Sequence, residues 1–222
     1  MKVNTDKTAV LCVSDALAYQ AETYLCDRDG VRLDGGDGMK VLGFRFGRRP
    51  TMDAQVEGFE KSVRQRLWVL RHLRRVGFTQ DDLKQIYVLM IRPVFDYCAV
   101  VYHSMLLDEH DERLKRLQAR ALQCIYGTGS SARKMRDLAD ISTLRARRED
   151  LCDKFVRKCL GNPRYKGWFP LRGGRVGRNS ELYLEQKARC DRLANSPIFY
   201  FRRRLNGKVG KKYGKRNAMY RE

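Results

Sequence analysis

Clustered arginines are the residues of this sequence whose type and spacing point most directly to a chemistry. Arg64, Arg71, Arg74 and Arg75 recur within one short stretch, and Arg202-Arg203-Arg204 is an unbroken run. Guanidinium groups bind phosphate oxygens through paired hydrogen bonds, and such contacts hold a nucleic-acid backbone without reading its sequence. A solvated charged face explains any single arginine, but for the clusters we favour phosphate binding. The candidates chosen on charge are Arg64, Arg71, Arg74, Arg75, Lys115, Arg116, Arg202, Arg203, Arg204, Lys211 and Lys212.

The overall charge supports the same interpretation. The 222 residues include 46 Lys and Arg against 26 Asp and Glu, a formal net charge of +20. Residues 171–222 alone hold 15 basic and 4 acidic residues, a net +11 and more than half of the excess. Solubility does not require so large a charge, which indicates a polyanionic partner.

The cysteines and histidines show no spacing typical of a metal site. Structural zinc sites need Cys or His pairs a few residues apart, and the seven cysteines and three histidines are not arranged in this way. We expect reduced, mostly buried thiols, with no metal and no cofactor in this chain. A signal peptide and a long apolar run are both lacking. We therefore expect an intracellular protein, cytoplasmic and/or nuclear, that is not secreted and has no membrane partner; its oligomeric state stays open.

The elements that must position these residues predict an α+β fold that is predominantly helical. Short apolar or alternating runs over 8–14, 22–33 and 39–46 predict strands, with a turn at Arg28-Asp29-Gly30. We expect a small N-terminal antiparallel β element packed on a helical bundle, followed by a basic C-terminal extension. The predicted domains are 1–50, 51–162 and 163–222.

Helical periodicity begins at Pro50. Thr51 is a candidate cap, and an apolar stripe then leads to Gly77, which ends the helix. Thr79 and Asp82 predict a capping box, and Pro93 predicts a kink in the helix that follows. Further helices are expected over 94–107 (the most buried), 108–126, 133–140 and from Ser142 to about 160. The stripe consists of Val56, Phe59, Val63, Leu67, Leu70 and Leu73.

The last sixty residues combine aromatic and basic side chains. We expect a loop over 163–180, a short helix over 181–193 and a mobile basic tail over 202–216. Aromatics among arginines suit base stacking with phosphate contact, and they equally suit anchoring onto the helices. For Trp168 and Phe169 we favour anchoring; for Phe199-Tyr200-Phe201 both readings stay open.

Several short motifs, in order along residues 1–160, resemble a known family. Asn4-Thr5-Asp6-Lys7-Thr8 precedes an apolar strand, and Lys40-Val41-Leu42-Gly43 follows about thirty residues later. They are followed by Ile86-Tyr87 with Ile91-Arg92-Pro93-Val94-Phe95-Asp96-Tyr97, by Leu114 with Gln118-Ala119-Arg120-Ala121-Leu122, and by Leu144-Arg145-Ala146-Arg147-Arg148. Each motif alone is weak. Together they resemble the C-terminal part of the reverse transcriptase of non-LTR (LINE-type) retrotransposons, an RNA-directed DNA polymerase of transposable elements.

This resemblance implies roles for particular residues. Residues 1–50 would be the end of the palm and 51–162 the thumb and connection, lying along a template–primer duplex of RNA or DNA. Lys7 would lie near the incoming nucleotide. Lys40 and Gly43 would belong to the primer grip, where glycine allows close backbone approach. A solvated lysine and a strand bulge are the simpler alternatives.

The catalytic carboxylates of the family are missing from this chain. Nucleotidyl transfer needs two carboxylates that hold two divalent metal ions. In the family they belong to a Tyr/Phe-x-Asp-Asp turn that precedes the Asn-x-x-Lys-Thr motif, and only three residues precede Asn4 here. We therefore expect a truncated protein with no catalytic residue and no polymerase activity of its own; Mg²⁺ is implied only for the intact family enzyme.

Three function hypotheses remain. The first is a truncated reverse transcriptase-like protein that retains non-specific RNA or DNA backbone binding. The alternative is a non-enzymatic basic helical RNA-binding or adaptor protein derived from a retrotransposon. An enzyme completed by a separate chain ranks third.

Overall fold

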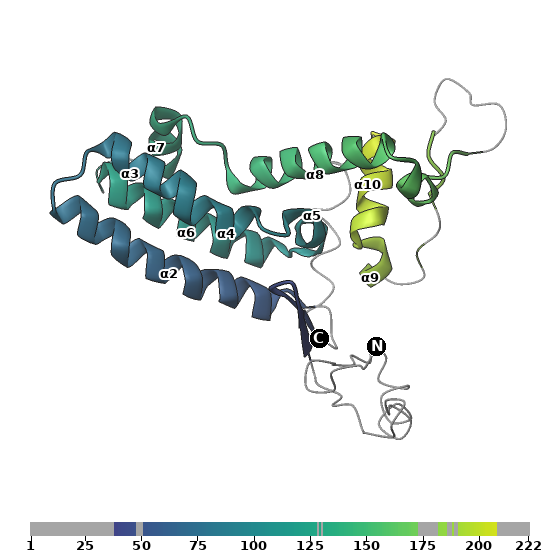
Figure 1. The fold of residues 1–222 in the computed structure, drawn as a ribbon, viewed down its shortest axis with the longest axis horizontal. Coiled ribbons are helices and arrows are strands. Elements are labelled where there is room, and N and C mark those ends of the chain that lie inside the picture. The colour runs from purple at the N-terminus through teal and green to yellow at the C-terminus, as the bar shows by residue number, and fades with distance from the viewer. Residues whose placement is uncertain are drawn as a thin grey trace, which may run out of the picture. The chain divides into compact units, whose positions relative to one another are not determined.

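The computed structural model describes residues 38–47, 51–127, 129, 131–172, 182–185, 188 and 191–207. The chain divides into two units, Met1–Gln55 and Val56–Glu222. Helices dominate the described residues, and the sheet there is one antiparallel pair of strands (Figure 1). The predicted α+β, mostly helical class is confirmed. The strands expected over 8–33 lie outside the described residues.

A β-hairpin occupies the region where a single strand was predicted. Strand β1 (Gly38–Val41) pairs with β2 (Phe44–Gly47), and Val41 lies opposite Phe44. The two turn residues both have positive φ angles, 48° at Leu42 and 86° at Gly43, as in the two-residue turns that match strand twist. The prediction of one strand over 39–46 is therefore wrong, because the chain reverses at Leu42-Gly43.

Helix α2 (Asp53–Arg75) follows the predicted apolar stripe closely. Val56, Phe59, Val63, Leu67 and Leu70 are all buried, as their three- and four-residue spacing requires. The helix starts two residues after the predicted cap at Thr51. Its end is as predicted: Gly77 has φ +99°, which a residue with a side chain adopts only with strain.

The predicted capping box opens the next helical segment. Thr79 and Asp82 exchange side-chain-to-backbone hydrogen bonds at the start of α3 (Gln80–Ile86). The segment then widens into a π-helix, η2 (Tyr87–Ile91), before α4 (Arg92–Asp96). The π-helical turn ends two residues before Pro93, which has no N–H to donate.

The single buried helix predicted over 94–107 is wrong. Tyr97 is extended and Cys98 has φ 54°, so the chain breaks before α5 (Ala99–Tyr102) and the 3-10 turn η3 (His103–Met105). The break deprives the Phe95 carbonyl of its helical donor, and the hydroxyl of Tyr102 donates to it instead. Tyr102 and Phe95 are both fully buried.

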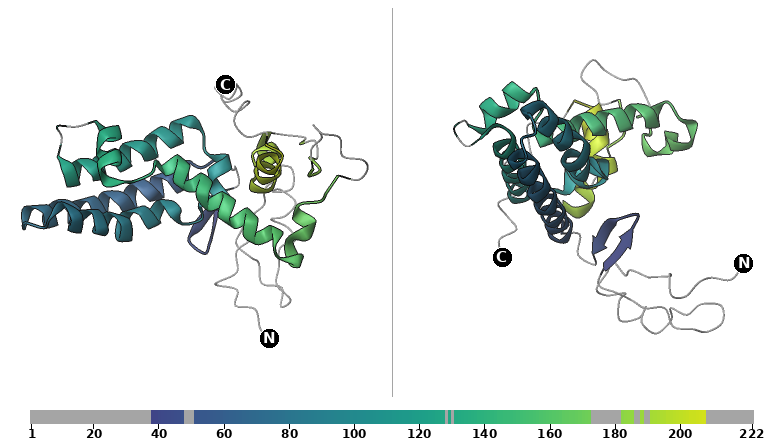
Figure 2. Two further views of the ribbon diagram at one scale, coloured as in Figure 1. Left: turned by 90° about the horizontal axis from the view of Figure 1, so that it is seen from above. Right: turned by 60° about the vertical axis from the view of Figure 1, so that its left-hand side comes forward.

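Helices α6 (Asp108–Tyr126), α7 (Ala132–Ala139) and α8 (Leu144–Leu160) agree with the predicted helices within a few residues. Thr143, and not Ser142, caps α8. Helix α6 runs alongside α2 in the same direction: the Arg113 guanidinium binds Glu60 at 2.9 Å, and Arg74 reaches the carbonyls at the end of α6. Figure 2 gives further views of these helices.

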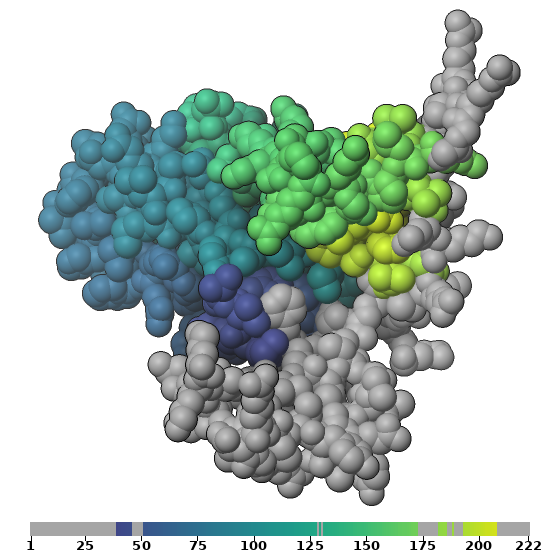
Figure 3. Space-filling model, turned by 45° about the vertical axis from the view of Figure 1, so that its right-hand side comes forward, coloured from purple at the N-terminus to yellow at the C-terminus, as the bar shows by residue number. Residues whose placement is uncertain are grey.

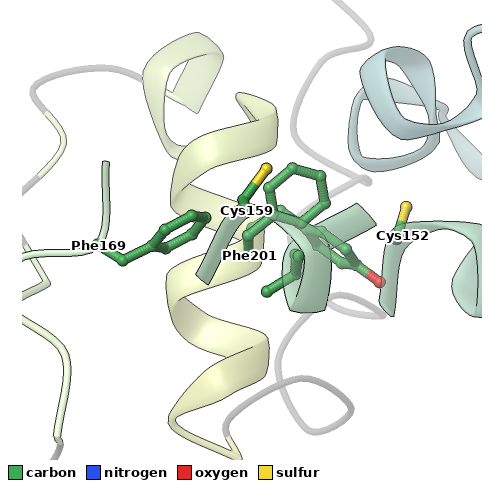
Figure 4. Packing of buried hydrophobic residues seen from close by; sticks show 6 residues of the cluster. Cys152, Cys159, Phe169 and Phe201 are labelled. Carbon is green, nitrogen blue, oxygen red and sulfur yellow. The ribbon is translucent and has the colours of Figure 1, made fainter. Parts of the chain in front are cut away.

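Two C-terminal elements pack on α8, the 3-10 helix η4 (Pro163–Trp168) and α10 (Pro197–Leu205), and the short helix α9 (Asp191–Ala194) contacts α10. Phe169 and Phe201 bury their rings in a cluster with Cys152 and Cys159 of α8 (Figure 4). In Figure 3, α10 lies against α8 at the molecular surface.

Two sequence predictions fail in this C-terminal region. The helix expected over 181–193 is wrong in its described part, since Tyr183 forms an antiparallel bridge with Leu171 and helix begins only at Asp191. Asn206 holds this extended segment through both the N–H and the carbonyl of Tyr183. The mobile tail is wrong for Arg202-Arg203-Arg204, which belong to α10.

Candidate nucleic-acid interface

One face of α2 combines cations with an aromatic side chain. We call it the α2 basic face and define it as Arg64, Trp68, Arg71, His72 and Arg75. Each of these positions lies three or four residues from another member of the set, so they share one side of the helix. All five side chains are exposed, and they lie away from the buried apolar stripe of α2.

Carboxylates are scarce along this face. Between Glu60 and Asp81 the sequence holds six Lys or Arg and no Asp or Glu. Arg64 lies 3.4 Å from Glu60, but Glu60 is bound more closely by Arg113 at 2.9 Å. That hydrogen bond from Arg113 is the main reason that the pKa of Glu60 is lowered. In the described chain, Arg71 and Arg75 have no carboxylate within ion-pair distance.

Arg74 was predicted to bind phosphate with its neighbours, and the structure gives it an intramolecular role. Its Nη1 atom donates to the carbonyl of Cys124 at 3.0 Å and to that of Gln123 at 3.3 Å. These carbonyls belong to the last turn of α6, where backbone acceptors lack helical donors. Arg74 therefore caps α6 and ties it to α2.

The α6 candidates differ from each other. Lys115 lies 2.6 Å from Glu112 and 3.7 Å from Asp111, and the hydrogen bond that it donates to Glu112 raises the pKa of Lys115. Arg116 is exposed and has no hydrogen-bond or ion-pair partner in the described part of the chain. Only Arg116 therefore keeps its charge uncompensated by a near carboxylate.

The three consecutive arginines of α10 are engaged with the protein itself. Arg202 is 7% exposed, and its Nε donates to the Trp168 carbonyl at 2.9 Å. Burial lowers the pKa of Arg202. Arg203 donates to the Ala194 carbonyl. These contacts fix the arginines in place of the mobile phosphate-binding run that the sequence suggested.

Arg204 is held by carboxylates of α8. Both of its contacts with Asp153 are hydrogen-bonded, one of them at 2.7 Å, and Glu149 lies 4.0 Å away. The hydrogen bond with Asp153 raises the pKa of Arg204. Such paired contacts anchor α10 to α8 and compensate the charge.

The remaining candidates are in the N-terminal unit or outside the described residues. Lys40 is exposed on β1, and Gly43 forms the hairpin turn described above. Lys7, Lys211 and Lys212 lie outside the residues that the structure describes. The structure therefore brings together only Arg64, Arg71 and Arg75 of the predicted set as one exposed face.

Sequence reasoning missed Trp68 and His72. Their rings stack with centroids 5.7 Å apart and planes inclined by 8°. Trp68 follows Arg64 by four residues and precedes Arg71 by three, so its place among the cations was visible in the helical spacing.

A buried polar network was also missed, and it is structural in character. His103 Nε2 lies 3.0 Å from the Tyr200 hydroxyl, and Arg148 Nε lies 3.4 Å from His103 Nδ1. Arg148 also forms a buried ion pair with Asp111. Burial lowers the pKa of His103 to about 4 and raises that of the Cys152 thiol to about 12. Near neutrality the Cys152 thiol keeps its proton and His103 is only weakly basic, so neither resembles an activated nucleophile or a general base.

Among the described residues, no group of three or more His, Cys, Asp or Glu side chains could hold a metal ion. No single described helix is long and apolar enough to cross a membrane; the pair Gln80–Asp96 and Ala99–Met105, bent by 43°, passes only when taken together, by length and composition.

Comparison of the chain with family models, curated proteins and solved structures gave no match.

Proposed function

We propose that this chain binds the sugar-phosphate backbone of RNA or DNA through the α2 basic face, as a reverse transcriptase-like protein without a polymerase centre of its own. One observation carries the proposal. Arg71 and Arg75 are exposed on a helix that has six cations and no carboxylate between Glu60 and Asp81. Uncompensated cations on a rigid element attract phosphates, which supply most of the affinity in non-specific binding.

Helix electrostatics alone explain this face poorly. Cations stabilise the last turn of a helix because its carbonyls carry a partial negative charge. Arg74 already binds the carbonyls at the end of α6, and Arg75 suits the end of α2. Arg64 and Arg71, however, lie before the last turn of α2, where the dipole effect has largely decayed.

Contacts between the resembling motifs support the reverse transcriptase-like origin. Gln118 donates to the hydroxyl of Tyr87 at 3.2 Å, which joins the second helical motif to the first. Arg147 binds Asp96 at 3.0 Å, which joins the third to the first. The motifs thus form one packed unit, as parts of a common thumb-like element would.

Salt-dependent binding tests the proposal. The full chain should bind labelled RNA and DNA of unrelated sequence with similar affinity, and the logarithm of the binding constant should fall linearly with the logarithm of salt concentration. Replacing Arg64, Arg71 and Arg75 together by Ala should reduce that slope by about 2, because each lost phosphate contact removes roughly 0.7 to 0.9.

A charge-matched control separates the face from total charge. Arg157, Lys158 and Lys166 are exposed on α8 and η4, and their replacement by Ala removes the same charge elsewhere. The control variant should keep the slope of the unchanged protein. A flat salt dependence, or equal losses in the two triple variants, would overturn the proposal.

The remaining parts of the proposal need separate measurements. A primer-extension assay with Mg²⁺ or Mn²⁺ should give no template-directed product from this chain alone; incorporation would contradict the missing polymerase centre. The adaptor alternative shares the basic surface but requires a defined partner, so tight binding of one RNA sequence over all others would favour it.

A further inference from the structure

Trp68 occupies the centre of the α2 basic face, and it is 66% exposed. Tryptophan is buried on average in folded proteins, so an indole left in water within a cluster of arginines invites a functional explanation. The five residues of the face extend over about 16 Å of helix, at about 1.5 Å per residue. An indole with cations on both sides is thus presented on one rigid element.

The surroundings of Trp68 select the kind of partner. An apolar protein surface would require apolar neighbours, but within α2 Trp68 is the only large apolar side chain that is exposed in the described chain, and the exposed Val76 and Phe78 follow only after the helix has ended. Its neighbours along the face are Arg64, Arg71 and Arg75, with His72 stacked on the ring. An aromatic platform flanked by cations suits a nucleobase that stacks on the ring while the adjoining phosphates meet the cations.

We infer that Trp68, backed by His72, is a stacking platform for an unpaired base, so that the α2 basic face prefers single-stranded nucleic acid to a duplex. This inference rests on the proposed function. In a duplex the base faces are already stacked, and opening a step for an inserted side chain costs a few kcal/mol. A single strand offers its bases freely. The chemistry is common to RNA and DNA, since every base has a π-face.

Abasic oligonucleotides separate stacking from phosphate binding. The probes are a single-stranded RNA, a single-stranded DNA and an abasic strand of equal length and charge, with the DNA duplex as a competitor. The full chain should bind the base-containing strands about tenfold more tightly than the abasic strand, as one stacked base provides. The duplex should compete more weakly than the single strand.

The variants assign this preference to one residue. The Trp68→Ala variant should bind base-containing and abasic strands equally, with the affinity that the unchanged chain has for the abasic strand, and its salt slope should be unchanged. The Trp68→Phe variant should keep part of the preference for base-containing strands. Trp168→Ala is the matched control, because its indole is also partly exposed and only its backbone carbonyl binds Arg202; it should keep the full preference. In the Trp168→Phe variant, Trp68 is the one remaining tryptophan. Its fluorescence should be quenched by the base-containing strands and not by the abasic strand.

The possible failures are distinct. Equal binding of base-containing and abasic strands by the unchanged chain, with a steep salt slope, would overturn the stacking platform and leave backbone binding intact. Weak, salt-insensitive binding of every probe would overturn the proposed function as well. Tighter binding of the duplex would contradict the single-strand preference.

Discussion

Arg71 and Arg75 on α2 are exposed and have no carboxylate partner in the described chain, whereas Arg202 and Arg204 on α10 bind the Trp168 carbonyl and the Asp153 carboxylate. The sequence presents both groups as basic clusters of similar density. In the structure only the first group is available to a phosphate. A cluster of arginines is therefore a candidate phosphate surface only where carbonyls and carboxylates of the protein do not already bind the guanidinium groups.

The position of the buried apolar residues relative to the arginines explains why only the arginines of α2 are exposed. In α2 the buried residues recur every three or four positions, so the opposite face of the helix is left to exposed side chains, which are cations and polar groups around Trp68. In α10 the buried pair Tyr200-Phe201 directly precedes the arginines, and this short helix lies against α8. Its arginines therefore lie within hydrogen-bonding distance of carbonyls and carboxylates of the protein itself.

The largest effect that can test this comparison is the removal of an α10 anchor. Phe201 is buried against α8, with its ring 5.8 Å from that of Phe155. Phe201→Ala should lower the free energy of unfolding by about 3 to 5 kcal/mol, because the site loses a large buried ring and gains a cavity. Urea unfolding of the full chain, followed by circular dichroism, measures it.

A neighbouring phenylalanine on α10 provides the control. Phe199 is only partly buried, so Phe199→Ala should cost clearly less. If Phe201→Ala left stability unchanged, α10 would not be anchored, and the contrast between the two arginine groups would fail.

A smaller effect on stability should come from the protonation of His103, which belongs to the buried polar network with Tyr200 and Arg148. Burial and the nearby Arg148 lower the pKa of His103 from 6.5 to about 4. The unfolded chain then binds more protons between these values, so the stabilisation is complete above about pH 6.5 and is lost as pH falls toward 4. The contribution of His103 to the free energy of unfolding should therefore be about 2 kcal/mol smaller at pH 5 than at pH 7.5.

The variant His103→Gln isolates that contribution. It removes the titration but retains a polar partner for the Tyr200 hydroxyl, which lies 3.0 Å from His103. Carboxylates with lowered pKa values, such as Glu60, titrate in both proteins and cancel in the difference. The same loss of stability in the variant at pH 5 would show that His103 is not the responsible group.

The helices with strong local signals could be predicted from the sequence. The apolar stripe from Val56 to Leu70 predicted both the helix α2 and its buried face, and Thr79 with Asp82 predicted the start of α3. Periodicity and capping act within a few residues, so they survive in any tertiary context. The same periodicity placed Arg64, Arg71 and Arg75 on the opposite, exposed face.

The errors occur where distant contacts decide the local structure. The chain leaves the helix at Tyr97 and Cys98, which has φ 54°, although no Gly or Pro marks that point, and the buried hydroxyl of Tyr102 donates to the Phe95 carbonyl. Arg202 and Arg204 are fixed by Trp168 and Asp153, which are 34 and 51 residues away. No local pattern encodes such pairings, which is why the arginine run was mistaken for a mobile tail.

The smallest effect sharpens the comparison within α2 itself, between adjacent arginines. Arg74 donates to the carbonyls of Gln123 and Cys124, whereas Arg75 is exposed and has no carboxylate within ion-pair distance among the described residues. Arg74→Ala should lower the free energy of unfolding by about 1 kcal/mol, since it removes charge-assisted hydrogen bonds at a helix end. Arg75→Ala should change stability by less than about 0.5 kcal/mol.

The variant with the smaller effect on stability should have the larger effect on nucleic-acid binding. Arg75→Ala should reduce the slope of log binding constant against log salt by about 0.7 to 0.9, and Arg74→Ala should leave it nearly unchanged. Thermal or urea unfolding paired with salt-dependent binding gives both quantities on the same proteins. Equal slopes for the two variants would mean that exposure, and not freedom from intramolecular partners, determines which arginines meet phosphate. Because each variant removes one positive charge from neighbouring positions of one helix, the difference between them cannot arise from net charge.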